Sequence, residues 1–218
     1  MTEMTEREEH ALKTAIEVFH RSCIKLQRHR YPNIFMEGNN ELLSEWFLDS
    51  LSDLEPLSLG KNDHPDYVIH NVGFELKSLK TKGQIQFNST IPCGGFKHGD
   101  LEGECYYVVA RYTTERNYGY LADYSVVDGD YFNHDRNWAF SHMNSQESGF
   151  GTYGDGVVRY RKMYQFPSPH KSIEGISFIS KFPFVHEINS NLVPNNYVDR
   201  VDVNGQPYRF YVYRHAFL

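Results

Sequence analysis

The pattern of apolar residues changes once along this chain, and that change favours a mixed α/β fold. In the first quarter, Leu12, Ile16 and Phe19 recur at the spacing of one helix face. Thr5 and Glu8 have the form of a capping box at the start of that helix. From about residue 65 onward, short β-rich runs and turn residues replace the helical spacing.

The same periodicities predict a second helix and several strands. Leu43, Trp46 and Phe47 lie on one face of a helix expected over residues 41–54. Aromatic residues make up 15% of the chain, which favours strands because Tyr and Phe suit a half-buried pleated surface. The expected strands cover residues 67–69, 72–79, 106–112, 118–127 and both sides of an Asn204-Gly205 turn. Residues 128–155 are polar and aperiodic, and a long loop is expected there.

Length and composition are typical of one soluble domain. The chain has 218 residues, of which 40% are hydrophobic and 23% charged. No apolar run reaches the roughly 18 residues that a membrane span needs, and the first ten residues are mostly polar. Three cysteines without close spacing indicate reduced thiols. We therefore expect a cytoplasmic protein with no membrane partner.

The net charge of −6 at first argues against a nucleic-acid partner. Residues 1–55 hold 11 acids and 6 bases, which accounts for five of the six excess negative charges. The remainder is nearly balanced, so it can still present a local basic face.

Two carboxylates and an ammonium are expected to converge on one predicted hairpin. Glu75 and Lys77 are two residues apart in a strand, so both side chains leave the same face. Asp66 begins the preceding strand, and pairing about His70-Asn71 brings it near them. Two close carboxylates repel each other, and a divalent cation relieves that repulsion. Hard oxygen ligands suit Mg²⁺, which takes one or two carboxylates and keeps several waters.

The segment Pro65-Asp66, eight intervening residues, then Glu75-Leu76-Lys77 resembles the core motif of the PD-(D/E)XK nuclease superfamily. The run from Phe74 to Leu79 is also similar to the Glu-Leu-Lys-Thr segment of the mismatch-repair nicking endonuclease and its restriction-enzyme relatives. The resemblance implies a mixed central β-sheet flanked by helices, a restriction-endonuclease-like core. It also implies that Asp66 and Glu75 bind Mg²⁺, with Mn²⁺ as a substitute, and that Lys77 assists the attacking water.

Many members of this superfamily add an acid from a helix before the motif. Glu41 or Glu45 fits that position, and Glu41 is preferred because it opens the helix beside Gly38. The resemblance covers at most residues 38–114. We expect a single nuclease domain over residues 1–218. Its expected parts are a helical N-terminal part (1–56), a catalytic core (57–128), DNA-recognition loops (129–171) and a β-rich C-terminal part (172–218).

A nuclease also needs groups that bind phosphates and read base edges. Lys80, Lys82 and Lys97 follow the motif and are candidates for phosphate binding. Arg, Asn and Gln pair with guanine and adenine edges, so a polar stretch rich in them is the candidate recognition element. Its DNA-binding candidates are His134, Arg136, Asn137, His142, Asn144 and Gln146, followed by Arg159 and Arg161.

The sequence therefore predicts a Mg²⁺-dependent type II restriction endonuclease that hydrolyses phosphodiester bonds in double-stranded DNA at a short sequence. A homodimer suits a palindromic site, although a monomer that nicks each strand in turn is also compatible. A cognate DNA methyltransferase is the expected genetic partner. Two alternatives stay open: a structure-specific or nicking repair nuclease of the same superfamily, and a non-catalytic DNA-binding protein.

Overall fold

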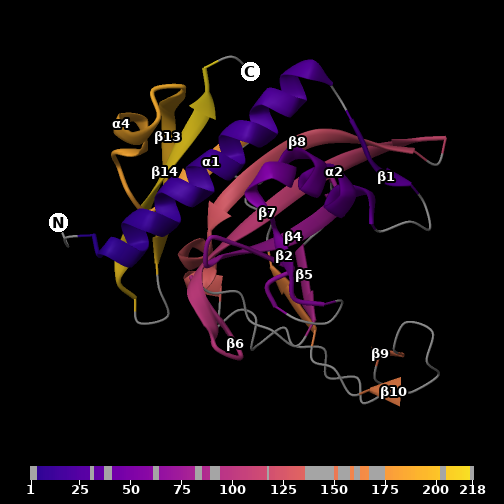
Figure 1. The fold of residues 1–218 in the computed structure, drawn as a ribbon, viewed down its shortest axis with the longest axis horizontal. Coiled ribbons are helices and arrows are strands. Elements are labelled where there is room, and N and C mark those ends of the chain that lie inside the picture. The colour runs from indigo at the N-terminus through magenta and orange to yellow at the C-terminus, as the bar shows by residue number, and fades with distance from the viewer. Residues whose placement is uncertain are drawn as a thin grey trace.

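The computed structural model describes residues 4–29, 32–36, 41–60, 64–81, 85–88, 94–116, 118–135, 150–151, 158–159, 163–166, 175–201 and 205–216. Its centre is a large mixed β-sheet, and its long helices lie across one face of that sheet (Figure 1). The expected α/β class and mixed sheet are therefore confirmed. Within the described residues the two longer α-helices pack into a single core cluster, so they cover one face instead of flanking both.

The N-terminal helix α1 (Glu6–Arg28) begins as its sequence predicts. Thr5 and Glu8 form the full capping box, with each side chain bonding the other residue's backbone N–H. The helix buries an apolar stripe that includes Leu12, Ile16 and Phe19, and three acids in its first turn suit the positive end of the helix dipole. Amphipathic spacing and capping therefore agree on where this helix starts and which face it buries.

The second helix is shorter than its periodicity predicts. Helix α2 (Leu42–Ser50) ends four residues before the expected boundary, and a 3₁₀ turn, η1 (Ser52–Leu54), follows it. The Ser50 hydroxyl donates to the carbonyl of Phe47, and serine side chains of this kind compete with the helical hydrogen-bond ladder. Local polar groups therefore end α2 although its apolar spacing continues to Leu51, which is buried.

Ten strands form the large sheet, in the order β13-β14-β12-β8-β7-β4-β3-β2, with β1 beside β8 and β6 beside β7. The β4–β7 and β8–β12 pairs are parallel and the other pairs antiparallel. The strands are β1 (Asn33–Met36), β2 (Leu57–Ser58), β3 (Tyr67–Ile69), β4 (Val72–Lys80), β6 (Gly95–His98), β7 (Leu101–Glu115), β8 (Tyr118–Asp128), β12 (Ile176–Ser180), β13 (Leu192–Val201) and β14 (Pro207–His215). Two small pairs lie outside it: β5 (Ile85–Asn88) with β11 (Met163–Phe166), and β9 (Phe150–Gly151) with β10 (Val158–Arg159).

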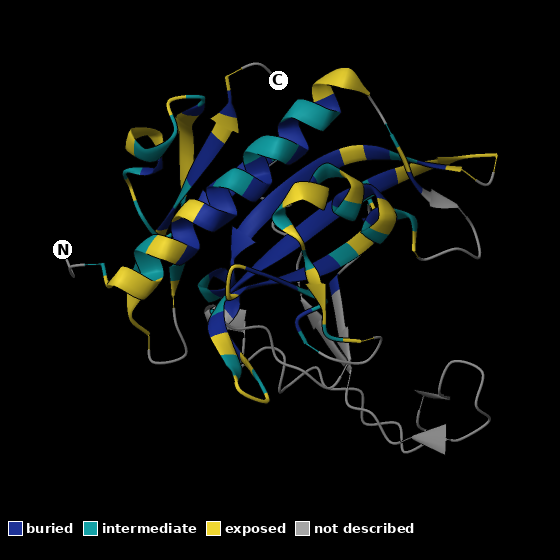
Figure 2. Ribbon diagram, in the orientation of Figure 1, coloured by how far each residue is buried: buried dark blue, intermediate teal, exposed yellow. Residues whose placement is uncertain are grey.

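The central strands are buried on both faces, as Figure 2 shows. One face packs on α1, α2 and the short helix α4 (Val185–Ile188) through Phe74, Val108 and Tyr124. The other face packs on β5, β6 and the 3₁₀ helix η2 (Gly129–Asp135). No helix among the described residues is long and apolar enough to cross a membrane.

Two expectations for the second half of the chain need correction. The aperiodic stretch after β8 starts with the 3₁₀ helix η2, which buries Tyr131 and Phe132. Strand β13 begins at Leu192, well before the expected β-rich run at the C-terminal turn. Its Pro194 is tolerated because β13 is an edge strand with a bulge there.

Candidate active site

The β3–β4 hairpin positions the candidate site through a two-residue turn. His70 and Asn71 have φ values of 48° and 61°, the left-handed pair that a tight hairpin turn requires. The register pairs Tyr67 with Phe74, so Asp66, which directly precedes β3, comes level with Glu75 on β4. The turn therefore sets which residues of the motif lie across from each other.

Alternation along β4 separates the motif from the helices. Phe74 and Leu76 point into the helix-covered core, where Phe74 packs on Phe47 of α2. Glu75 and Lys77 therefore point to the opposite face. There, the Glu75 carboxylate lies near His64, whose ring centroid is 6.1 Å from that of Tyr107, with the two rings tilted.

Asp66 is hydrogen-bonded to the backbone of β4, the strand on which Glu75 and Lys77 contact each other. Asp66 Oδ2 accepts a hydrogen bond from the backbone N–H of Leu76, at 2.7 Å. The Lys77 ammonium pairs with Glu75 Oε1, and His64 Nδ1 lies 3.0 Å from Glu75 Oε2. All three predicted motif side chains thus lie together, and the position of Asp66 is fixed by the strand that carries the other two.

The electrostatics of the pair separate its two carboxyl groups. Burial, then the negative charge of Glu75, raises the pKa of Asp66 from 3.8 to about 6, although Lys77 opposes both. Burial also acts to raise the pKa of Glu75, but the His64 hydrogen bond and the Lys77 charge outweigh it, and the pKa lies below its usual value. Glu75 is thus held ionised, and its negative charge disfavours ionisation of Asp66.

A divalent cation bound between Asp66 and Glu75 would offset the repulsion between their carboxylates. Asp66 and Glu75 supply hard oxygen ligands, and Glu75 itself is only 7% exposed. Among the described residues, no group of three or more His, Cys, Asp or Glu side chains is arranged to hold a metal ion. Two carboxylates still fit Mg²⁺, because that ion fills its remaining positions with water and substrate phosphate.

The other predicted catalytic residue lies at the start of α2. Glu41 is exposed and precedes a helix whose buried residues pack on the face opposite to Glu75 and Lys77. The alternative, Glu45, is likewise exposed on α2. The role of Glu41 as an accessory acid stays a prediction.

Few of the predicted DNA-binding side chains fall in the described part of the chain. Lys80 is exposed and, by strand alternation, shares the face of Leu76 instead of that of Lys77. Lys97 is exposed on β6, opposite Glu102 of β7. The candidates whose side chains lie outside the described residues are Lys82, His134, Arg136, Asn137, His142, Asn144, Gln146, Arg159 and Arg161.

Sequence reasoning assigned no role to His64, which contacts Glu75 directly. The available signal was its place beside Pro65 in the motif segment, but a lone histidine before a proline does not indicate where its ring points. Only the fold of the chain before β3 turns this ring towards β4.

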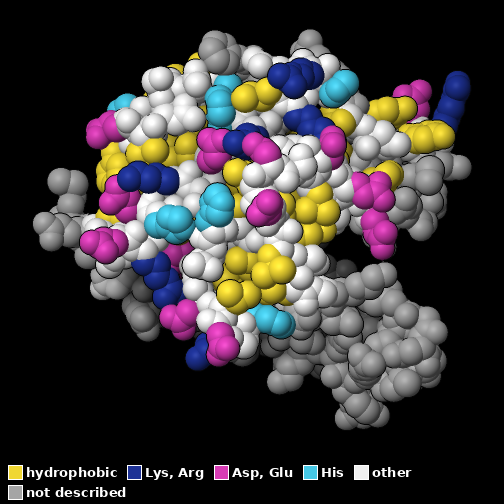
Figure 3. Space-filling model, in the orientation of Figure 1, with side chains coloured by type: hydrophobic (Ala, Val, Ile, Leu, Met, Phe, Trp, Pro, Cys, Tyr) yellow, Lys and Arg dark blue, Asp and Glu magenta, His cyan; other side chains and the backbone are white. Residues whose placement is uncertain are grey.

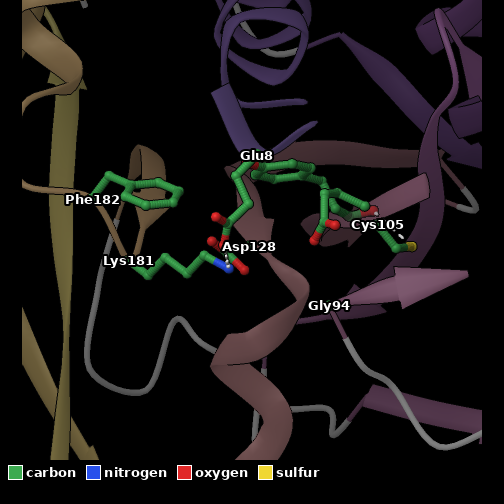
Figure 4. Close-up of a pocket in the computed structure, with 8 residues that line it drawn as sticks. Glu8, Gly94, Cys105, Asp128, Lys181 and Phe182 are labelled. Atoms are coloured by element: carbon green, nitrogen blue, oxygen red, sulfur yellow. Dashed lines mark hydrogen bonds and ion pairs between the residues drawn. The ribbon is translucent and has the colours of Figure 1, made fainter. Parts of the chain in front are cut away.

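A second, partly buried cluster of charges was also missed. Lys181 Nζ lies 3.0 Å from Glu8 Oε1 and 2.9 Å from Asp130 Oδ2, and Figure 4 shows this ammonium turned towards Glu8 and Asp128. Burial raises the pKa of Asp128 to about 7, and its Oδ2 has no hydrogen-bond partner among the described residues. The members are distant in sequence, so no spacing rule brings them together.

Charges of both signs are intermixed on the side of the molecule that carries α1 (Figure 3). Arg21 pairs with Glu17 and Asp53, and Lys25 pairs with Asp49. These pairs set acids beside Arg21 and Lys25, so this part of α1 offers no uniform basic stripe for a phosphate backbone.

Comparison with known proteins identifies no relative: no family model, no curated protein and no solved structure matches the chain.

Proposed function

We propose that this protein is a Mg²⁺-dependent endonuclease that hydrolyses phosphodiester bonds in double-stranded DNA at a short sequence, in the manner of a type II restriction enzyme. The observation that carries the proposal is the convergence of Asp66, Glu75 and Lys77 on one hairpin. The mixed sheet, with Glu75 and Lys77 on β4 and Asp66 directly before the neighbouring β3, supports a restriction-endonuclease-like core.

Each motif residue has a distinct task in the proposed reaction. Mg²⁺, when bound, supplies polarisation of the scissile phosphate and a lower pKa for a bound water. Asp66 and Glu75 would hold that ion through their carboxylate oxygens. Lys77, whose side chain is 23% exposed, orients the attacking water and stabilises the extra negative charge of the transition state.

The arrangement of Lys77 explains how it stays available for that task. Its ammonium is held by Glu75 Oε1 and lies on the same face of β4. Glu75 would hold a divalent ion on the face of β4 that also carries Lys77, so the ammonium is placed to orient the attacking water.

Incubation with large phage DNA and plasmid DNA tests the proposal. We expect discrete fragments with Mg²⁺, none with a chelator, and none from the Asp66→Asn variant. Discrete fragments support a sequence-specific nuclease. A continuous smear contradicts the sequence-specific part, and DNA that stays intact with the unaltered protein contradicts the nuclease itself.

Homodimerisation and a cognate DNA methyltransferase belong to the same proposal. A two-fold dimer matches the symmetry of a palindromic site. Sedimentation of the protein with and without DNA tests the dimer, since a monomer in both conditions contradicts it. A methyltransferase that protects DNA from cleavage tests the genetic partner.

A further inference from the structure

His64 is held on both sides of its ring by groups of the candidate site. Its Nδ1 lies 3.0 Å from Glu75 Oε2, and its Nε2 lies 3.8 Å from the Cys105 sulfur. Its ring packs near that of Tyr107, and its side chain is 19% exposed. The orientation of this imidazole is therefore fixed by neighbours and not by solvent.

The partners of His64 determine which ring nitrogen carries the hydrogen. The ionised carboxylate of Glu75 only accepts hydrogen bonds, so Nδ1 carries the hydrogen that it donates to Oε2. Each oxygen of Glu75 then has one donor, because Lys77 donates to Oε1. A carboxylate held at both oxygens cannot rotate freely, and its remaining lone pairs keep a fixed direction.

From this geometry we infer that His64 is a positioning residue, which holds the Glu75 carboxylate in the orientation that binds the divalent ion. The inference rests on the proposed function, since it concerns the same metal site. Outer-sphere partners of metal-binding carboxylates commonly tune metal affinity by about 10–100-fold. His64 acts on the metal through Glu75, and Lys77 acts on the water, so the two donors to one carboxylate have separate tasks.

A nucleophilic role for the neighbouring thiol does not fit the same contacts. Cys105, His64 and Glu75 form a chain that resembles a cysteine–histidine–acid triad. However, Cys105 is 1% exposed, and its sulfur also lies 3.8 Å from the carbonyl oxygen of Tyr106. No substrate carbonyl reaches a sulfur buried in this way, so the chain serves to orient the imidazole.

Three substitutions at one position separate positioning from packing. His64→Ala removes both the ring and the donor, and His64→Phe retains a ring against Tyr107 without a donor. His64→Asn retains an amide N–H near the place of Nδ1. Titration calorimetry with Mn²⁺ on the full chain measures metal affinity, and the Mg²⁺ concentration for half-maximal cleavage gives a second readout.

We expect His64→Ala and His64→Phe to bind Mn²⁺ about 10–100-fold more weakly and to need correspondingly more Mg²⁺. His64→Asn should recover most of that loss, while the maximal rate at saturating Mg²⁺ changes little in all three. His186→Ala is the matched control, because His186 is exposed on α4 and away from β4. Circular dichroism and thermal unfolding show whether each variant keeps the fold.

The outcomes distinguish this inference from the proposed function. Normal Mn²⁺ affinity in His64→Ala, in a protein that binds metal and cleaves DNA, overturns the role of His64 alone. Equal losses of Mn²⁺ affinity in His64→Asn and His64→Ala also overturn it, because the N–H donor at this position then has no effect on metal binding. If the unaltered protein binds no Mn²⁺ and cleaves no DNA, the metal site itself is wrong.

Discussion

Two clusters of this protein combine buried acids with a lysine, yet they are built in different ways. The first, Asp66, Glu75 and Lys77, lies within one hairpin and carries an Asp whose pKa is raised to about 6. The second has Asp128, with its pKa raised to about 7, and Lys181, which pairs with Glu8 and Asp130. We refer to them as the hairpin cluster and the Lys181 cluster.

The two clusters differ in what the lysine does. In the Lys181 cluster the ammonium pairs with Glu8 of α1 and Asp130 of η2, which are far apart in sequence, and so ties the N-terminal helix to the sheet. Figure 4 shows the ammonium turned towards Glu8. In the hairpin cluster, Lys77 pairs with Glu75, which lies two residues away on the same strand. A buried acid with a raised pKa therefore does not by itself indicate a catalytic site. The Lys181 cluster has the contacts of a structural ion cluster, and the hairpin cluster is the candidate catalytic site.

The largest effect is expected on cleavage when Lys77 is truncated. Lys77→Ala should lower the cleavage rate by about 10²–10³-fold or more, because it removes one charge that stabilises the transition state. DNA binding should change little. Single-turnover cleavage and a binding titration measure the two effects, and near-normal cleavage removes Lys77 from the mechanism.

The matching change in the Lys181 cluster should act on stability instead. Lys181→Met leaves Glu8, Asp128 and Asp130 without their common cation. We expect a loss of about 2 kcal/mol in the free energy of unfolding, less than the 3–5 kcal/mol of a fully buried pair because the cluster is partly exposed. Urea unfolding measures the loss. A folded Lys181→Met variant that has lost cleavage would break the distinction between the clusters.

Asp128 should make the stability of the protein depend on pH. Its pKa in the folded chain is about 7, above the usual 3.8, so the folded state keeps a proton over this range that the unfolded state has lost. Stability from this group is therefore fully present below about pH 4 and is lost as pH rises through about 7. Asp128→Asn should flatten that decline, because the amide has no proton to lose over this range. Unfolding curves from pH 4 to 8 test this, and an unchanged slope contradicts it.

The smallest effect is expected at a histidine pair outside both clusters. His20 Nδ1 lies 2.9 Å from His215 Nε2, and burial, then the charge of His20, lowers the pKa of His215 below 6.5. Stability from His215 is present above pH 6.5 and is lost as pH falls through the lower pKa of the folded state. His20→Phe, which retains a stacked ring, should reduce that loss by a few tenths of a kcal/mol. A pH dependence that is the same in this variant contradicts the assignment.

The local parts of the fold were predictable from sequence. The capping box of α1, the turn at His70-Asn71 and the C-terminal hairpin all depend on residues close together in the chain. The end of α2 was not predictable in this way, because the Ser50 hydroxyl competes with the hydrogen bonds of the helix. Nor was η2, since a short 3₁₀ helix has no periodicity that a sequence reader can recognise.

The same limit applies to the candidate site. Asp66, Glu75 and Lys77 were predictable to lie together because strand alternation and one hairpin register determine their positions. The contact of His64 with Glu75 depends on the path of the chain before β3, and the Lys181 cluster depends on the packing of α1 against η2 and β12. Neither arrangement can be inferred from the spacing of residues along the sequence.

Binding of Mn²⁺ to the protein without DNA tests the central claim most directly. The binding is measured by the decrease in the electron paramagnetic resonance signal of the free ion. We predict saturable binding that is lost in Asp66→Asn and in Glu75→Gln and is retained in Asp128→Asn. Binding that is unchanged in Asp66→Asn, or absent from the unaltered protein, would contradict a metal site on the hairpin.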